Sequence, residues 1–123
     1  MNNVELTIWG RKFNLNVEYD CYEGEEITDV QNKALEKFVT CDTEIEKSLE
    51  HVKKYCKNNA LGENVGDIDN IFKFVVPTDL YVVRDNKRKV AILCEYKFDI
   101  EHGLAIIFEN EKYKTVDSPD SVL

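Results

Sequence analysis

Residues 89–116 read KVAILCEYKFDIEHGLAIIFENEKYKTV, and two apolar runs within this stretch indicate the centre of a β-sheet. In residues 90–94 and again in residues 104–108, the side chains on both faces of an extended chain are apolar. A strand of this composition is stable where other parts of the protein cover both of its faces. We therefore expect these strands to lie centrally in a sheet, with helices covering one face.

Polar turns divide the C-terminal half of the chain into a β-meander. They lie at residues 85–86 and 110–111, where polar side chains interrupt the apolar alternation. The strands that they separate are expected at residues 80–84, 89–98, 103–109 and 112–116. The second turn would place Glu109 directly opposite Lys112, and an opposite-charge pair of this kind stabilises a hairpin.

The N-terminal residues have the alternation of an antiparallel hairpin. The apolar side chains that alternate with polar ones are Val4, Leu6, Ile8, Phe13, Leu15 and Val17. We expect a two-residue type II′ turn at Gly10-Arg11, because glycine readily takes the positive φ that the first turn position requires. This turn pairs Ile8 with Phe13 and keeps all of the apolar side chains on one face.

Two amphipathic helices are expected between the hairpin and the meander. Thr28 and Gln31 have the spacing of a capping box, and a second capping box is expected at Thr43 and Glu46. Apolar residues at helical spacing follow each box. The second helix should end near residues 57–60, because a glycine follows soon afterwards.

The segment before Pro77 fits two interpretations. Residues 68–76 have the apolar spacing of a helix, while residues 72–76 alone also fit a strand. We expect a short helix that ends before Pro77, since the residue before a proline disfavours helical backbone angles. The loop at residues 59–67 is too short to separate two domains.

Together these elements predict a single α+β domain over residues 1–123. Its antiparallel sheet combines the N-terminal hairpin with the C-terminal meander. Two or three helices are inserted between them and pack on one face. With 43% hydrophobic residues, the chain can form one core without disulfides or metals.

The sequence also bears on where the protein resides. Its apolar runs are far too short to span a bilayer. Residues 1–5 show no basic segment leading into an apolar one, so no secretory signal is expected. We expect a cytoplasmic protein that does not bind membranes.

The cysteines, Cys21, Cys41, Cys56 and Cys94, are interpreted as structural or incidental thiols. An even number could form disulfides, but without a leader peptide nothing indicates an oxidising compartment. Their spacing matches no zinc site. Cys41 is the one cysteine with a feature that favours reactivity, because a helix start directly after it could lower its pKa.

The net charge of the chain indicates which classes of partner it can bind. The chain carries 24 acidic and 16 basic side chains, a net charge of −8. This charge repels nucleic acid and anionic lipid and favours a basic protein partner. The alternative is that acidity only keeps the protein soluble.

The acidic residues concentrate between Lys12 and Lys33, where no basic residue lies. They are Glu18, Asp20, Glu23, Glu25, Glu26 and Asp29. Glu26 and Asp29 lie at a helix start, where a negative charge complements the helix dipole. We predict that Glu18, Asp20, Glu23, Glu25 and Glu26 bind the partner.

The segment at residues 99–103 is the second candidate site. Asp99, Glu101 and His102 are residue types that supply acid–base catalysis or a metal site. Adjacent residues on one turn cannot enclose a metal, however, and we expect them mainly to shape a hairpin closed by Gly103. A ligand contact is the weaker alternative. No phosphate-binding loop or nucleophile motif is present, so we expect neither cofactor nor catalysis.

Two other polar features have simple interpretations. His51 lies off the apolar stripe of the second expected helix and is expected on the surface. The basic residues around the turn at 85–86 are Arg84, Lys87, Arg88 and Lys89. We interpret them as protection of a hairpin edge against aggregation, with nucleic-acid binding as the alternative.

Residues 98–108, FDIEHGLAIIF, follow residues 77–82, PTDLYV, and together they resemble a group of small bacterial domains of unknown function. Members carry an Asp-x-Glu-His-Gly-Leu hairpin, then a strand and a short acidic tail, here residues 117–123. Residues 10–13, GRKF, are also similar to part of that group.

Some domains of this group lie near polymorphic toxin genes and are thought to be immunity proteins. The resemblance implies that this chain binds and blocks a basic toxin, and it implies no catalytic residue. The leading hypothesis is therefore a non-catalytic binding protein of the immunity type. The alternatives are a small enzyme or ligand-binding domain using Asp99, Glu101 and His102, and a regulatory or structural module.

Overall fold

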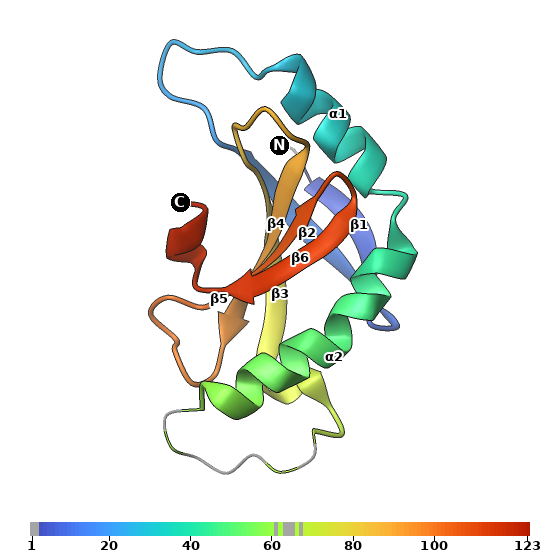
Figure 1. Cartoon of the computed structure of the whole chain (residues 1–123), viewed down its shortest axis with the longest axis vertical. Helices are drawn as coiled ribbons and strands as arrows, with labels where there is room; N and C mark the ends of the chain where they lie inside the picture. The colour runs from blue at the N-terminus through green and yellow to red at the C-terminus, as the bar shows by residue number, and fades with distance from the viewer. Residues whose placement is uncertain (1–2, 61, 63–65, 67) are drawn as a thin grey trace.

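The protein is a six-stranded β-sheet with two α-helices on one face (Figure 1). The computed structural model describes residues 3–60, 62, 66 and 68–123. The strands are β1 (Asn3–Ile8), β2 (Arg11–Tyr19), β3 (Val75–Val82), β4 (Lys89–Tyr96), β5 (Leu104–Glu109) and β6 (Lys112–Asp117). The helices are α1 (Asp29–Phe38) and α2 (Asp42–Asn58), with short 3₁₀ helices at Ile71–Lys73 and Pro119–Ser121. The predicted α+β fold is confirmed.

Strand order in the sheet follows the chain, β1-β2-β3-β4-β5-β6, and one pair differs from the predicted antiparallel arrangement. β2 and β3 run parallel, with Val17 opposite Leu80. α1 and α2 lie between these strands in the chain, and a parallel pair requires a long crossover of this kind. The helices therefore return the chain to the end of the sheet where β2 began.

The predicted turn of the first hairpin is wrong by one residue. The turn is formed by Trp9 and Gly10, both at positive φ (51° and 82°), which is the type I′ arrangement. Ile8 consequently lies opposite Arg11 and not opposite Phe13. The register is shifted by two positions, so the apolar side chains keep their common face.

Trp9 decides this turn. A bulky residue rarely adopts a positive φ, and it persists there only where its surroundings hold it. The Trp9 side chain is buried, and its indole Nε1 donates to the carbonyl oxygen of Ile45 at 3.1 Å and to Ser48 Oγ at 3.2 Å. Contact with α2 thus overrides the local preference for glycine in the first turn position.

Capping differs between the two helices. The box at Thr28 and Gln31 is confirmed, with Gln31 N donating to Thr28 Oγ1 at 3.1 Å and Thr28 N to Gln31 Oε1 at 2.9 Å. The second predicted box is wrong, because α2 begins earlier and has Cys41 at its N-cap without a side-chain bond. Acidic residues in the first turn, among them Asp42, complement the α2 dipole instead.

The segment before Pro77 contains a short helix, but it is only the 3₁₀ helix Ile71–Lys73 and not a helix over all of residues 68–76. β3 begins at Val75 and includes Pro77. β2 pairs with β3 only from Asp79 onward, and the β3–β4 register shifts between Pro77 and Asp79. A proline is tolerated there because no neighbouring strand needs its missing N–H.

The central position of β4 and β5 is confirmed. Ile92, Leu104 and Ile106 are fully buried on the face that the helices cover. On the opposite face Ala91, Ala105 and Ile107 are also buried. They pack with Tyr81 of β3, Leu93 of β4 and Val122 near the C-terminus. Both faces of these strands are therefore covered, as their composition requires. The expected pair of Glu109 opposite Lys112 is also present.

Replacing Trp9 tests the tertiary control of the first turn. We expect Trp9→Phe to lower the free energy of unfolding by about 2–3 kcal/mol, because it removes a buried hydrogen-bond donor and leaves a cavity. Urea denaturation followed by circular dichroism measures this change. Tyr22→Phe is the control, since Tyr22 is 75% exposed and the loss of its hydroxyl should change stability by less than about 0.5 kcal/mol.

Candidate protein-interaction surface

Most of the predicted partner-binding residues lie on the connection between β2 and α1, residues 20–28, which we name the acidic loop. It projects beyond the end of the sheet beside the N-terminus of α1 (Figure 1). Asp20, Glu23, Glu25 and Glu26 belong to this loop, and Glu18 precedes it on β2. The structure therefore brings the predicted residues together at one end of the molecule.

The base of the acidic loop is fixed to β3 by a buried amide. Asp20 N donates to the carbonyl oxygen of Val82 at 2.9 Å. Gln31, whose side chain is fully buried, donates from Nε2 to the carbonyl oxygens of Asp20 at 2.9 Å and Val82 at 3.3 Å. The capping residue of α1 thus also joins the ends of β2 and β3.

Arg84 holds the middle of the loop. Its guanidinium donates from Nη1 to the carbonyl oxygen of Glu26 at 3.1 Å, and Nη2 lies 3.4 Å from Glu25 Oε2. Its backbone N donates to Asp20 Oδ2 at 3.2 Å. Asp20 and Glu25 therefore have structural roles, and the charge of Glu25 is partly balanced by Arg84.

The tip of the loop is an ordered turn. Glu25 N donates to the carbonyl oxygen of Tyr22 at 2.9 Å, and Tyr22 N donates to Glu25 Oε1 at 3.0 Å. Gly24 occupies the left-handed region with φ 86°. These bonds hold the Tyr22 ring outward, where 75% of the residue is exposed. Ile27, also exposed, lies at the other end of the turn.

Two carboxylates at the tip remain without a side-chain partner. Across the described part of the chain, no hydrogen bond or ion pair engages the carboxylate of Glu23 or Glu26, and both residues are exposed. We name Tyr22, Glu23, Glu26 and Ile27 the acidic tip. It combines an aromatic ring, an aliphatic side chain and two unbalanced charges on a held backbone.

Glu18 lies apart from the acidic tip, on the face of the sheet opposite the helices. It accepts from Asn16 Nδ2 at 3.3 Å and lies beside Tyr81 in the parallel register. Burial, with the nearby carboxylates of Asp20 and Glu18, raises the pKa of Tyr81 to about 12. The Tyr81 hydroxyl therefore stays protonated at neutral pH, and Glu18 does not belong to the acidic tip.

The second candidate site, at residues 99–103, forms the β4–β5 turn. Asp99 Oδ1 accepts from His102 N at 3.2 Å and contacts His102 Nδ1 at 3.0 Å. Gly103 N donates to the Asp99 carbonyl oxygen at 2.8 Å. Gly103 has φ 77°, and a Cβ there would collide with the carbonyl oxygen of Cys94. The predicted hairpin-shaping role of these residues is confirmed.

A shallow hollow of about 210 Å³ borders this turn and includes Glu101 and His102 in its wall. Glu101 and His102 are exposed, whereas the Asp99 carboxylate is occupied by the turn itself. Within the described ranges, no group of three histidine, cysteine or acidic residues is placed to hold a metal ion. A small-ligand contact at Glu101 and His102 stays a prediction.

Residues 2–123 match the profile of "Domain of unknown function (DUF6985)". The chain belongs to the DUF6985 family. No curated protein and no solved structure matches it.

The cysteines of this DUF6985 domain are free thiols. Cys56 and Cys94 are buried, and burial raises the pKa of Cys56 to about 11 and that of Cys94 still further. The helix start after Cys41 does not lower its pKa, because burial and the nearby Glu111 carboxylate raise it. The desolvation of the thiol outweighs the helix start.

The basic group of the DUF6985 domain lies in the interior of the sheet order, between β3 and β4, so its interpretation as edge protection is wrong. Arg88 binds Glu111 through Nε at 2.6 Å and Nη2 at 3.0 Å, and Lys87 lies 2.9 Å from Glu109. These cations join two neighbouring turns. His51 is exposed as expected and stacks on Tyr113, with ring centroids 4.2 Å apart.

Membrane insertion of the DUF6985 domain finds no support in its helices. Over residues 3–60, 62, 66 and 68–123, no helix has the length and apolar character needed to cross a bilayer.

Sequence reasoning missed the roles of Arg84 and Tyr22 and the second role of Gln31. A signal for Arg84 existed, because an acidic stretch without local cations favours a cation from elsewhere in the chain. Which cation fills this role depends on the parallel pairing of β2 and β3, which places Arg84 next to Asp20.

Replacing Gln31 tests how the acidic loop is held. Gln31→Met keeps the length of the side chain but removes the donor to the carbonyl oxygen of Asp20 and the acceptor for Thr28 N, while Val82 keeps its bond from Asp20 N, so we expect a loss of about 2–3 kcal/mol in the free energy of unfolding. Amide hydrogen exchange in residues 20–28 should also accelerate. Lys33→Met introduces the same residue at an exposed position and should change neither measurement.

The pKa of His102 tests the Asp99 turn. The neighbouring Asp99 raises it above its ordinary value of 6.5, so the charged contact is present below pH 6.5 and is lost as pH rises through the raised pKa. In an NMR titration of the imidazole protons, Asp99→Asn should lower the His102 pKa. Glu101→Gln should lower it less, because Glu101 contributes less. Equal shifts in both variants would contradict the Asp99 contact.

Proposed function

We propose that this DUF6985 domain is a non-catalytic, cytoplasmic binding protein of the immunity type, which neutralises a basic protein partner through the acidic loop. The observation that carries this proposal is the acidic tip. The exposed Tyr22 and Ile27 and the unbalanced Glu23 and Glu26 lie on a backbone that Arg84 and Gln31 hold in place.

The composition of the tip suits a protein interface. Aromatic side chains are enriched among the residues that dominate binding energy, and surrounding polar groups exclude water. A preformed loop loses little conformational entropy when it binds. Tyr22 would be the anchor, while Glu23 and Glu26 would meet basic groups of the partner.

Charge supports the choice of a basic partner. The net charge of −8 would steer a basic protein toward the domain and increase the association rate at low salt. Since Arg84 pairs with Glu25 and its backbone N engages the Asp20 carboxylate, we assign steering mainly to Glu23 and Glu26. Glu18 and the structural carboxylates Asp20 and Glu25 would border the contact.

A ligand-binding function at the β4–β5 turn is the second candidate, favoured by the hollow next to Glu101 and His102. The Asp99 carboxylate is engaged by His102 within the turn, so Asp99 is poorly placed to act as an acid or base on a ligand. A regulatory or structural role is the third. Protein binding through the acidic tip is the function that the geometry supports best.

Charge reversal at the tip tests the proposal. If the gene next to this one encodes a basic protein, that protein is purified, and its association with the domain is measured by stopped-flow fluorescence at low and high salt. We expect Glu23→Lys/Glu26→Lys to slow association at least about ten-fold at low salt, and much less at high salt.

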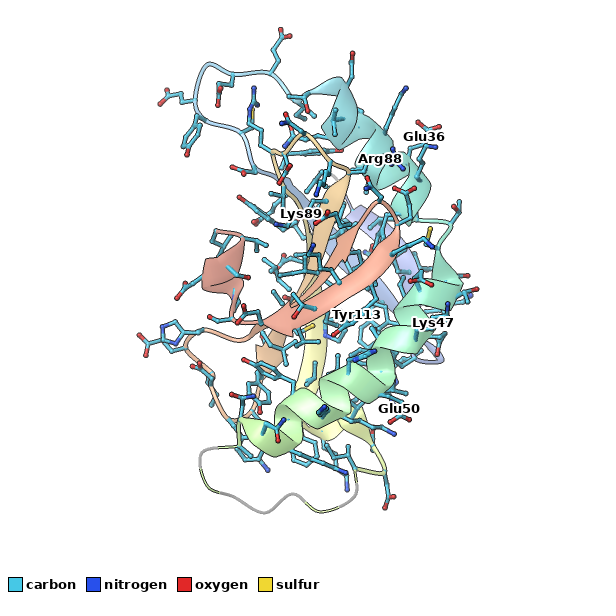
Figure 2. All side chains as sticks on the ribbon, viewed as in Figure 1. Glu36, Lys47, Glu50, Arg88, Lys89 and Tyr113 are labelled. Carbon is cyan, nitrogen blue, oxygen red and sulfur yellow. The ribbon has the colours of Figure 1, made fainter. Side chains whose placement is uncertain are left out.

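The matched control is Glu46→Lys/Glu50→Lys, which makes the same change in net charge on exposed residues of α2. Glu50 points outward from α2, away from the acidic loop (Figure 2). An equal slowing in both double variants would show that only net charge matters and would remove the tip as the binding site.

Immunity itself has a separate test. If the neighbouring gene product stops bacterial growth, co-expression of the wild-type domain should restore growth, and the tip variant should restore it poorly. Growth arrest that the wild-type domain does not relieve would contradict the immunity function. A neighbour that is not toxic but binds through the tip would favour a regulatory module.

A further inference from the structure

The two edges of the sheet differ in how they are protected. At the β6 edge, the Glu44 carboxylate of α2 accepts from Tyr113 N at 3.0 Å, and α2 packs along β6. At the other edge, α2 also contacts β1, but β1 pairs with no strand except β2. β1 has no lysine, proline or bulge to prevent further pairing, and its one charged residue is Glu5.

The register of the first hairpin shows which backbone groups of β1 face outward. A two-residue turn makes the flanking residues, Ile8 and Arg11, a hydrogen-bonded pair, and bonding alternates along the strand from there. The N–H and C=O groups of Thr7, Glu5 and Asn3 therefore point away from β2. In the described part of the chain, no hydrogen bond engages them.

A groove lies beside the start of this edge, between the sheet and α1. Its volume is about 440 Å³. Its apolar lining comes from β1, β2 and α1: Val4, Val17, Tyr19, Leu35 and Val39. Asn3, Asn32 and Glu36 form its polar border, and Glu36 lies on the outer side of α1 (Figure 2). An open strand edge thus adjoins a preformed apolar groove.

We propose that β1 accepts an extended segment of a basic protein partner as a seventh strand, with apolar residues alternating with lysine or arginine. Alternate side chains of an added strand point to opposite faces of the sheet. Those on the helix side would enter the groove between Val4 and Leu35. Those on the other side would lie beside Asn3, Glu5 and Thr7, where a cation would pair with Glu5.

A second copy of the chain suits this edge less well. The two-fold antiparallel register that pairs all of residues 3–7 places Glu5 directly opposite Glu5 of the other copy, and like charges in that position are destabilising. Each copy also carries a net charge of −8. The same Glu5 that opposes pairing with a second copy favours pairing with a basic strand. The inference rests on the proposed function only in taking the partner to be basic.

Synthetic peptides test the inference without knowledge of the partner. The probe is a blocked peptide of about eight residues that alternates lysine and valine. In heteronuclear NMR, we expect it to shift the amides of Asn3, Glu5 and Thr7 and to slow their hydrogen exchange. The same peptide with alternate backbone nitrogens methylated keeps its charge but loses its donors, so it should bind at least about ten-fold more weakly.

Variants of the protein test the role of Glu5. We expect Glu5→Lys, checked for folding by circular dichroism, to weaken the lysine peptide at least about five-fold and to strengthen a peptide alternating glutamate and valine. Glu46→Lys, with the same charge change on α2, should alter both affinities less. Equal effects of the two variants would overturn strand pairing at β1.

Three further outcomes would overturn the inference: equal binding of the methylated peptide, shifts confined to residues 20–28, or a dimer in sedimentation velocity that the lysine peptide dissociates. The last would assign the edge to a second copy. Because the peptide titration does not involve the acidic tip, it can fail while the tip variants still slow partner association, and the reverse also holds.

Discussion

The fold depends on one buried amide, that of Gln31. It closes the capping box with Thr28 and donates to the carbonyl oxygens of Asp20 and Val82, so it joins the start of α1 to the ends of β2 and β3. A buried amide is stable only with its hydrogen bonds made. The parallel pairing of β2 and β3, the path of the crossover and the origin of the acidic loop are therefore fixed together.

This constraint preorganises the acidic loop, the surface through which we propose that the domain binds a partner. A loop held at its base by Gln31 and along its length by Arg84 presents Tyr22, Glu23 and Ile27 without first having to order them. Such preorganisation reduces the entropic cost of binding. The loop also uses part of its acidity for its own structure, so fewer charges are free for a partner than the composition alone indicates.

Local patterns predicted much of the fold because they depend on neighbouring residues. The alternation in residues 4–17, the capping box of α1 and the double-sided apolar strands all express short-range periodicity. The features that were predicted wrongly depend instead on residues far away in the sequence. Trp9 at positive φ requires α2, and a strand that contains Pro77 requires that β2 pair elsewhere on β3. Neither neighbour is visible in the local sequence.

The amino-acid sequence by itself determined an acidic α+β protein with its charge concentrated before the first helix, since composition and periodicity depend on the chain alone. Only the tertiary structure decided which carboxylates are free, because Arg84 reaches Glu25 across a separation of many residues. It also decided that the β1 edge stays open while Glu44 covers the β6 edge. Ion pairs and strand pairing depend on the distance between groups that are far apart in the sequence. The topology of the sheet sets these distances.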